Sequence, residues 1–369
     1  MTEYKKSIIN SNKPPDFKFL SGHKRQEMQP NYALLALSEY ADEITSPDRY
    51  GLGDVVQDFE QSVSKMLGME RAIFLPTGTM AQQIAIRVCS ERTGINRIAF
   101  HPTSHLELHE SLSYQHIHKL QAIKVGQINR LIQISDVKNI TSDISVLILE
   151  LPQSELGGEL PDWDSLVEIC SWVKSKGIHL HLDGARLWET QPFFNRELKE
   201  ICELFNSVYV SFYKTIGAIS GAMLLGSDSF IEQSLKWRHR HGGNLYRFYP
   251  YVLSAKKEIE SRLNKIPLYC LKAIDIAESI NQIAGVTTRP LIPHTNMMHV
   301  YLEGKKQNLL EAAAESATQD KILIYSDLES TSKKGIWRFT IWVGDSTLEI
   351  STKKIKKLIE TIVRSRACL

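Results

Sequence analysis

Short apolar runs alternate with amphipathic stretches through the first two thirds of the chain. The runs RIAFH, ISVLILEL, IHLHLD, SVYVSF and SGAMLL predict buried strands at 97–101, 144–151, 178–183, 207–212 and 220–225. Apolar residues at helical spacing predict helices over 54–66 and 163–176, and the segment RAIFLPTGTMAQ predicts a strand, a turn and a helix. Strands that alternate with helices predict an α/β fold with a mainly parallel sheet covered on both faces.

The pattern changes towards the C-terminus. A long helix is predicted from about residue 251, followed by half-exposed strands in HTNMMHVYLE, KILIYS and WRFTIWV and by the amphipathic helix TKKIKKLIETIVRS. These elements predict a small α+β domain over 265–369, after a large domain over 31–264. Residues 1–30 are polar and contain Pro14, Pro15 and Pro30, which predicts an arm leading into a helix over 32–40. The basic face of the last helix is interpreted as solvated surface rather than as a site for an acidic partner.

Composition narrows the classes of function. The chain has 369 residues, of which 43% are hydrophobic and 23% are charged, which is typical of a globular protein with room for two domains. A net charge of +2 gives no overall attraction to nucleic acid or to an anionic membrane. Five scattered cysteines without CxxC spacing suit a reducing compartment. With no apolar run long enough for a signal peptide or a membrane span, the prediction is a soluble cytoplasmic protein.

Lys214 is the single charged residue in the segment SFYKTIGAISGAMLLG. Gly217, Ala218 and Gly221 are small, so another group can approach the backbone there. A lysine desolvated in such surroundings has a lowered pKa, and its amine becomes a nucleophile towards carbonyl groups. The alternative is a lysine at a strand end with its ammonium group in water. This segment alone leaves both interpretations open.

The segment GIHLHLDGARLW places His179, His181 and Asp183 on one face of a predicted strand. A His-x-His-x-Asp pattern could hold a metal ion, or the imidazoles could be hydrogen-bonded between layers of the fold. Asp183 stands where the strand ends, and parallel sheets bind ligands at the carboxyl ends of their strands. An aspartate in that place suits a protonated ring nitrogen.

Two further segments contain candidate ligand-binding groups. In FLPTGTM, a strand runs into a turn and a helix start at Gly78 and Thr79, which is a typical phosphate site but also an ordinary helix cap. Five histidines lie between residues 101 and 118, and His105 and His109 are four residues apart. They could bind a metal, stack on an aromatic cofactor, or lie in a polar interior.

Taken together, these segments resemble the threonine aldolase family of pyridoxal 5′-phosphate (PLP) enzymes, whose fold is the aspartate-aminotransferase-like fold type I. The similar motifs, in chain order, are DRYG at 48–51, IFLPTGTMA at 73–81, HLDGARLW at 181–188, SFYKTIGAISGAMLLG at 211–226, KWRHRHGG at 236–243 and HTNMMHV at 294–300. They extend over most of the chain.

The resemblance implies a role for several residues towards PLP. Lys214 would bind the cofactor covalently through its amine, and Asp183 would keep the pyridine nitrogen protonated so that the ring accepts electrons. Gly78 and Thr79 would hold the phosphate. His105 falls where the family has a histidine stacked on the ring.

The resemblance also implies how the substrate is bound. Arg186 and Arg338 would bind the carboxylate of an amino-acid substrate, together with Ser21 from the N-terminal arm, because the guanidinium group pairs with a carboxylate bidentately. Family sites are built by two subunits, which implies a homodimer or homotetramer in which Tyr50 and residues 238–241 act across the interface.

The implied reaction is retro-aldol cleavage of a β-hydroxy-α-amino acid to glycine and an aldehyde, with His105 or a water molecule as the base. Three departures from the family pattern leave threonine itself open as the substrate: Gln153 near the position of a family histidine, Tyr213 in place of a serine, and the altered segment 239–246. A bulkier β-hydroxy amino acid and β-elimination from another amino acid are alternatives. A metallohydrolase and a catalytically silent binding protein are the other classes considered.

Overall fold

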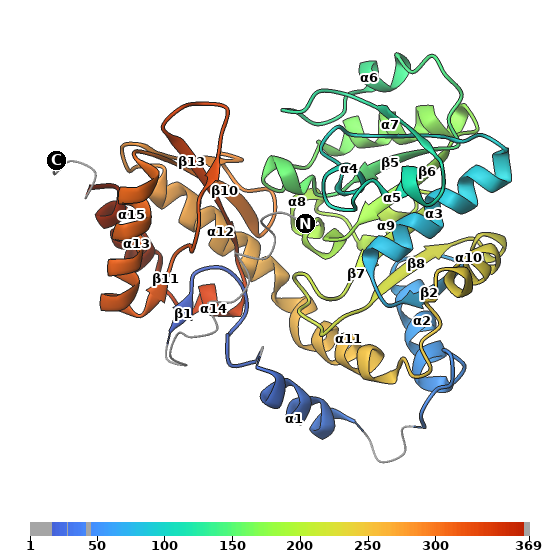
Figure 1. The fold of residues 1–369 in the computed structure, drawn as a ribbon, viewed down its shortest axis with the longest axis horizontal. Coiled ribbons are helices and arrows are strands. Elements are labelled where there is room, and N and C mark those ends of the chain that lie inside the picture. Colours follow the sequence, from blue (N-terminus) through green and yellow to red (C-terminus); the bar gives the residue numbers. More distant parts are fainter. Residues whose placement is uncertain (1–16, 28, 42–45, 365–369) are drawn as a thin grey trace. The chain divides into compact units, whose positions relative to one another are not determined.

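The computed structural model describes residues 17–27, 29–41 and 46–364 (Figure 1). Pro14 and Pro15 of the predicted arm lie outside the described residues. The chain divides into two compact units: a large unit from Leu37 to Lys265, and a small unit that joins residues up to Ala36 with those from Ile266 onward. None of the helices in the described ranges is long and apolar enough to cross a membrane.

The large unit is built on a seven-stranded sheet in the order β2-β8-β7-β6-β5-β3-β4. The strands are β2 (Arg71–Leu75), β3 (Arg97–Phe100), β4 (Gln121–Lys124), β5 (Val146–Glu150), β6 (His179–Gly184), β7 (Ser207–Ser211) and β8 (Ala222–Gly226). Strand β8 pairs antiparallel with both of its neighbours, and every other neighbouring pair is parallel. The mainly parallel sheet that the sequence predicted is therefore confirmed.

Helices surround this sheet (Figure 1). The helices of the large unit are α2 (Asp54–Met66), α3 (Gly78–Thr93), α4 (His105–Leu108), α5 (Ser113–His116), α6 (Ile134–Lys138), α7 (Trp163–Ser175), α8 (Gln191–Phe194), α9 (Leu198–Cys202), α10 (Asp228–Arg240) and α11 (Tyr249–Arg262), with short 3₁₀ turns η1 (Ser154–Leu156), η2 (Leu187–Glu189) and η3 (Leu263–Lys265). Helix α3 packs on β7 and β8, α7 packs on β6, and α10 packs on α3. Ile84, Ile98 and Ile148 contribute to the buried core between helices and sheet.

The small unit contains an antiparallel sheet in the order β12-β13-β10-β9. Its elements are β1 (Lys18–Phe19), α12 (Ile266–Ile280), β9 (Val286–Arg289), β10 (Met297–Glu303), α13 (Lys306–Asp320), β11 (Ile322–Leu323), β12 (Glu329–Ser330), β13 (Ile336–Trp342), α14 (Asp345–Leu348) and α15 (Thr352–Arg364); helix α1 (Pro30–Tyr40) contains the boundary between the units. Helix α15 packs on α12 and α13 and buries Ile355, Leu358 and Ile362.

One predicted element is corrected. The long helix expected from about residue 251 is α11, but the half-exposed strands expected next are preceded by a second helix, α12, beyond a break at the 3₁₀ turn η3. Pro267 explains the break, because proline has no N–H to continue a helical hydrogen-bond ladder and restricts the residue before it.

The carboxyl ends of β5, β6 and β7 lie side by side. Glu150 at the end of β5 pairs in register with Asp183 on β6, which pairs in turn with Tyr209 on β7. The segment that contains Lys214 follows β7 directly. The sheet topology therefore brings to one edge the groups that the sequence placed at three different strand ends.

Candidate active site

Lys214 lies in the loop between β7 and β8 and is half-buried. Burial and, to a smaller extent, the Arg186 guanidinium lower the pKa of its amine to about 8, against the opposite effect of the carboxylates of Asp183, Glu150 and Glu189. An amine with this pKa is partly neutral near neutral pH. The structure therefore supports the nucleophile interpretation over a lysine with its ammonium group in open water.

Asp183 is buried at the end of β6, with an exposed fraction of 2%. Within the described residues, its carboxylate accepts one hydrogen bond, from the Ala185 N–H at 3.2 Å. Burial and the neighbouring Glu150 carboxylate raise the pKa of Asp183 to about 6, whereas Lys214 and His105 lower it. A buried carboxylate with so few donors is costly unless a cation or a strong donor faces it. A protonated pyridine nitrogen fits this place.

The start of helix α3 faces two tyrosine hydroxyl groups. Thr77 caps the helix by accepting the Met80 N–H, and the Gly78 N–H donates to Tyr213 Oη at 3.3 Å. Tyr209 Oη lies 3.3 Å from Tyr213 Oη. A Cβ atom on Gly78 would lie 1.8 Å from Tyr209 Oη, so only glycine allows this approach. The N–H groups of the first helical turn and the hydroxyl groups form a cradle suited to phosphate.

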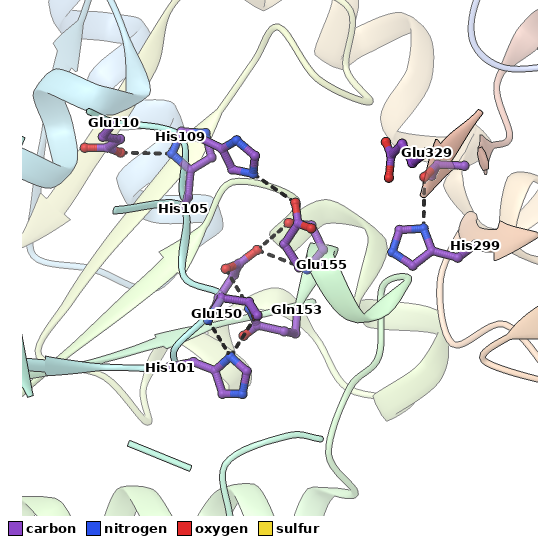
Figure 2. A network of polar contacts seen from close by, with 12 residues as sticks. His101, His105, His109, Glu110, Glu150, Gln153, Glu155, His299 and Glu329 are labelled. Carbon is purple, nitrogen blue, oxygen red and sulfur yellow. Dashed lines mark hydrogen bonds and ion pairs between the residues drawn. The ribbon is translucent and has the colours of Figure 1, made fainter. Parts of the chain in front are cut away.

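His105 begins helix α4, and its ring is held by a carboxylate. The Nδ1 atom lies 3.0 Å from Oε1 of the buried Glu110, whose Oε2 accepts a hydrogen bond from Gln83 at 2.7 Å. His109 lies one turn further along, and its Nε2 is 2.9 Å from Glu155 Oε1 (Figure 2). The structure thus brings together two imidazoles, each paired with its own glutamate.

Arg186 is the second residue after β6 and is half-buried. Its guanidinium group acts on the pKa values of both Lys214 and Glu189. Glu189 is fully buried and accepts a hydrogen bond from the Thr215 hydroxyl; burial raises the pKa of Glu189 to about 7. Arg186 therefore places a positive charge beside the candidate amine.

Tyr50 is exposed, with 45% of its surface accessible, and its backbone is left-handed with a φ of 55°. Its ring stands edge-on to Tyr246 at 5.4 Å, and the Arg49 guanidinium lies over both rings. The buried Asp48 carboxylate accepts the N–H groups of Gly51, Phe248 and Tyr249. Asp48 of the DRYG motif thus fixes the turn that presents Tyr50 at the surface.

Ser21 and Arg338 belong to the small unit. The Ser21 hydroxyl donates to the Thr340 carbonyl at 3.3 Å and accepts the Trp342 N–H at 3.4 Å. Arg338 on β13 donates from Nε to Glu329 Oε2 at 2.8 Å. Both candidate substrate ligands are therefore tied to the antiparallel sheet of that unit.

His101, His179 and His181 have hydrogen-bond partners within the protein. His179 and His181 share the Ser207 hydroxyl at 2.8 and 2.7 Å, and His181 Nε2 lies 3.1 Å from Gln82 Oε1. His101 bonds the Thr103 hydroxyl at 2.8 Å. Across the described ranges, no group of three or more His, Cys, Asp or Glu side chains could hold a metal ion. The hydrogen-bonded interpretation of these imidazoles is the one that the geometry supports.

Sequence reasoning did not single out Tyr209, Glu110 or Glu155. A signal existed for Tyr209, because it stands on the predicted strand SVYVSF, three residues before that strand's end. Glu110 is five residues from its partner His105, whereas Glu155 had no local signal, since its partner His109 lies 46 residues away in the chain. Gln153, noted as a departure, donates to Thr103 Oγ1 and to Glu150 Oε2 and so belongs to the polar network beside β5 (Figure 2).

Comparison with known proteins identifies the family to which a chain with these site residues belongs. The family model described as beta-eliminating lyase matches residues 39–303. The chain belongs to the beta-eliminating lyase family. This membership confirms the predicted family and the predicted fold class, fold type I, and it makes the chain a PLP-dependent lyase, as the resemblance implied.

Members of known structure and curated relatives match along most of the chain. A protein from Listeria monocytogenes, provisionally described as an L-allo-threonine aldolase, is 37% identical, with a TM-score of 0.90 over 98% of this chain and 97% of the other. An Exiguobacterium protein, provisionally described as an aromatic amino acid beta-eliminating lyase/threonine aldolase, is 34% identical, with a TM-score of 0.89 over 94% and 97%. Low-specificity L-threonine aldolase 1 of Arabidopsis thaliana is 25% identical over 75% of this chain and 80% of its own.

Proposed function

We propose that the protein cleaves a β-hydroxy-α-amino acid of the threonine or allo-threonine type to glycine and an aldehyde. The observation that carries the proposal is the Lys214 amine, whose pKa burial lowers to about 8, next to strand ends that carry the buried Asp183. The names of the Listeria and Arabidopsis relatives support this substrate class.

The residues of the large unit fit PLP. Lys214 would hold it covalently, Asp183 would pair with its ring nitrogen, His105 would cover its ring, and Gly78 with Thr79 would hold its phosphate. When bound, the cofactor supplies an electron sink for the bond that breaks at the substrate α-carbon. The buried Asp183 carboxylate would favour a positive charge on the ring nitrogen, and the Glu110 side chain fixes the orientation of His105.

A carboxylate clamp would orient the substrate. Arg186 supplies the guanidinium group beside Lys214. The resemblance extends the same role to Arg338 and Ser21, whose own contacts lie in the small unit. Holding the carboxylate fixes rotation about the Cα–N bond, so that the Cα–Cβ bond is the one positioned to break.

The proposal includes an assembly and a location. We infer a cytoplasmic homodimer or homotetramer with shared active sites, in which the exposed Tyr50 and the segment 238–241 act on the site of the partner subunit. Support comes from the family resemblance and from the fixed, accessible position of Tyr50 on its turn.

The test is a substrate panel on PLP-loaded protein. L-threonine, L-allo-threonine and phenylserine should each be assayed for glycine release, and serine and tyrosine for pyruvate and ammonia. Glycine release that is absent in Lys214→Ala, together with loss of the visible absorbance of bound PLP in that variant, is the expected result. Pyruvate release without glycine would replace the proposal with β-elimination, the activity included in the name of the Exiguobacterium relative. Full activity in Lys214→Ala would refute the site itself.

A further inference from the structure

Two imidazoles of the large unit stand one helical turn apart, and each is held by a different glutamate. The rings of His105 and His109 lie 5.1 Å apart, centroid to centroid, at an interplanar angle of 47°. Glu110 holds His105 through Nδ1, and Glu155 holds His109 through Nε2. Figure 2 shows the pair of rings with the two carboxylates on opposite sides. Such a duplicated arrangement suggests two separate tasks.

The surroundings of His105 suit a fixed ring rather than a proton carrier. Glu110 is buried, and its second oxygen is bound by Gln83 at 2.7 Å, so the pair forms a rigid network. In the proposed function, this ring covers the cofactor with its face. Removal of the β-hydroxyl proton then needs another base.

His109 has the properties of that base. Its side chain is 37% exposed, so a substrate atom can reach it. The bond to Glu155 fixes the proton on Nε2 and leaves the lone pair on Nδ1, which makes no hydrogen bond among the described residues. A carboxylate that orients a histidine in this way is a common arrangement for a general base.

His109 lies beside the ring proposed to cover the cofactor, since the His105 and His109 centroids are 5.1 Å apart. Its pKa is raised by the hydrogen bond and the charge of Glu155 and by the charge of Glu150, and it is lowered by burial and by the charge of Lys214. His109 therefore lies within electrostatic range of the candidate amine. The raised pKa makes the neutral ring a stronger proton acceptor than an ordinary imidazole.

Other nearby polar groups are less suited to accept the proton. Glu150 accepts hydrogen bonds from the Ser154 N–H, the Ser154 hydroxyl and the Gln153 amide, so both of its oxygens are engaged. Gln153 has an amide side chain, which is not basic.

We propose that His109 is the catalytic base that accepts the β-hydroxyl proton, and that Glu155 is the residue that positions it. This inference rests on the proposed function. In the step, the hydroxyl proton passes to Nδ1 of His109, the oxygen forms its second bond to Cβ, and the Cα–Cβ bond breaks. The aldehyde leaves, and the electron pair stays with Cα, which is later protonated to give glycine.

The first test separates this proton transfer from cofactor binding. His109→Phe should retain the visible absorbance of bound PLP and the exchange of the glycine α-proton in deuterated water, since glycine has no β-hydroxyl group. Cleavage of the best β-hydroxy substrate should fall by about 100-fold or more. Cleavage at the wild-type rate would overturn the inference. If His109→Phe loses the exchange of the glycine α-proton as well as cleavage, the inference is also wrong, because His109 then has a structural role.

The second test uses the pH profile of kcat/KM. His109 must be neutral to accept a proton, so activity falls on the acidic side as its ring becomes charged. In Glu155→Gln the pKa of His109 drops, since the carboxylate no longer stabilises the charged ring, and the acidic limb should move to lower pH. If the acidic limb of the pH profile does not move in Glu155→Gln, the proposed pairing of His109 with Glu155 is wrong.

The two proposals fail in different ways. If the wild-type protein cleaves no β-hydroxy amino acid, the proposed function is wrong. If the wild type cleaves such a substrate and His109→Phe cleaves it equally well, only the assignment of the base is wrong. Gln115→Ala, at an exposed position beyond helix α4, is a control that should leave both readouts unchanged.

Discussion

At Gly78 a single added methyl group would strike the hydroxyl group of Tyr209. The Cβ of Gly78→Ala would lie 1.8 Å from Tyr209 Oη and 2.7 Å from Tyr213 Oη, which forces the helix start or the tyrosines to move. Overpacking of this kind costs about 1–3 kcal/mol of stability. We expect a lower midpoint of thermal unfolding and at least about tenfold weaker PLP binding in a titration of the apoprotein.

Gly94→Ala is the matched control, at the residue that caps the other end of helix α3. Gly94 ends the helix with a φ of 71°, and no atom lies within 4 Å of a Cβ built there. The change should cost about 1 kcal/mol through backbone strain and leave PLP affinity unchanged. Equal PLP affinity in the two variants would argue against a phosphate site at Gly78.

At the scale of single residues, the sequence predicted those site residues that can be recognised from their position relative to a strand. Lys214 and Asp183 could be found because each follows a recognisable buried strand. The contacts of Glu110 with Gln83 and of Tyr209 with Gly78 could not be predicted, because each joins two different elements. Hydrophobic patterning reports which residues are buried, and it does not report which polar side chains meet.

At the scale of one element, strand β6 carries a buried histidine that makes stability depend on pH. Burial lowers the pKa of His181 to about 3, well below the 6.5 of an exposed imidazole. Below pH 6.5 the unfolded chain binds a proton that the folded chain does not, so stability falls as the pH drops towards the folded pKa. Between about pH 8 and about pH 5, this one group should remove about 2 kcal/mol of unfolding free energy.

Urea unfolding at both pH values checks this expectation. The loss of stability should be about 2 kcal/mol smaller in His181→Gln than in the wild type, whatever the absolute stability of the variant. His116→Gln removes an exposed histidine and should show the wild-type dependence. An unchanged pH dependence in His181→Gln would mean that the His181 imidazole is protonated in the folded protein.

Strands and helices with a clear pattern of hydrophobic residues were predicted correctly, and elements with a weak pattern were not. The helix expected at 54–66 is α2, and all five strand runs fall on strands of the sheet. Strand β4 was not expected, because its sequence QAIK is short and lies half-exposed at the sheet edge. Strand β4 is held in the sheet by parallel pairing with β3. The pattern of four residues does not predict such a contact.

At the scale of the whole molecule, the order of the six motifs predicted the family, whereas the pairing of distant segments was hidden. Strand β1 pairs in parallel with β11, and Gly22 forms a bridge with Val343. These contacts join the two ends of the chain within the small unit. Local periodicity carries no information about such partners, because it describes the face of an element and not its neighbour.

Subunit sharing of the active site can be tested by mixing two inactive proteins. Tyr50→Asn removes the exposed ring, and asparagine tolerates the left-handed backbone at this position, where φ is 55°. We expect this variant to fold and to lose activity, as we also expect of Lys214→Ala. If Tyr50 acts on the partner's site, a hybrid dimer contains one site with both Lys214 and Tyr50 intact.

Random reassociation of equal amounts gives hybrids in about half of the dimers, each with one working site of two, so about one quarter of wild-type activity should return. If Tyr50 acts within its own subunit, each site of the hybrid still contains one defect and no activity returns. The unmixed proteins, carried through the same dissociation and reassociation, show the background. Because a protomer of 42.0 kDa that stayed monomeric could not complement at all, recovered activity would establish both the association and the residue that crosses it.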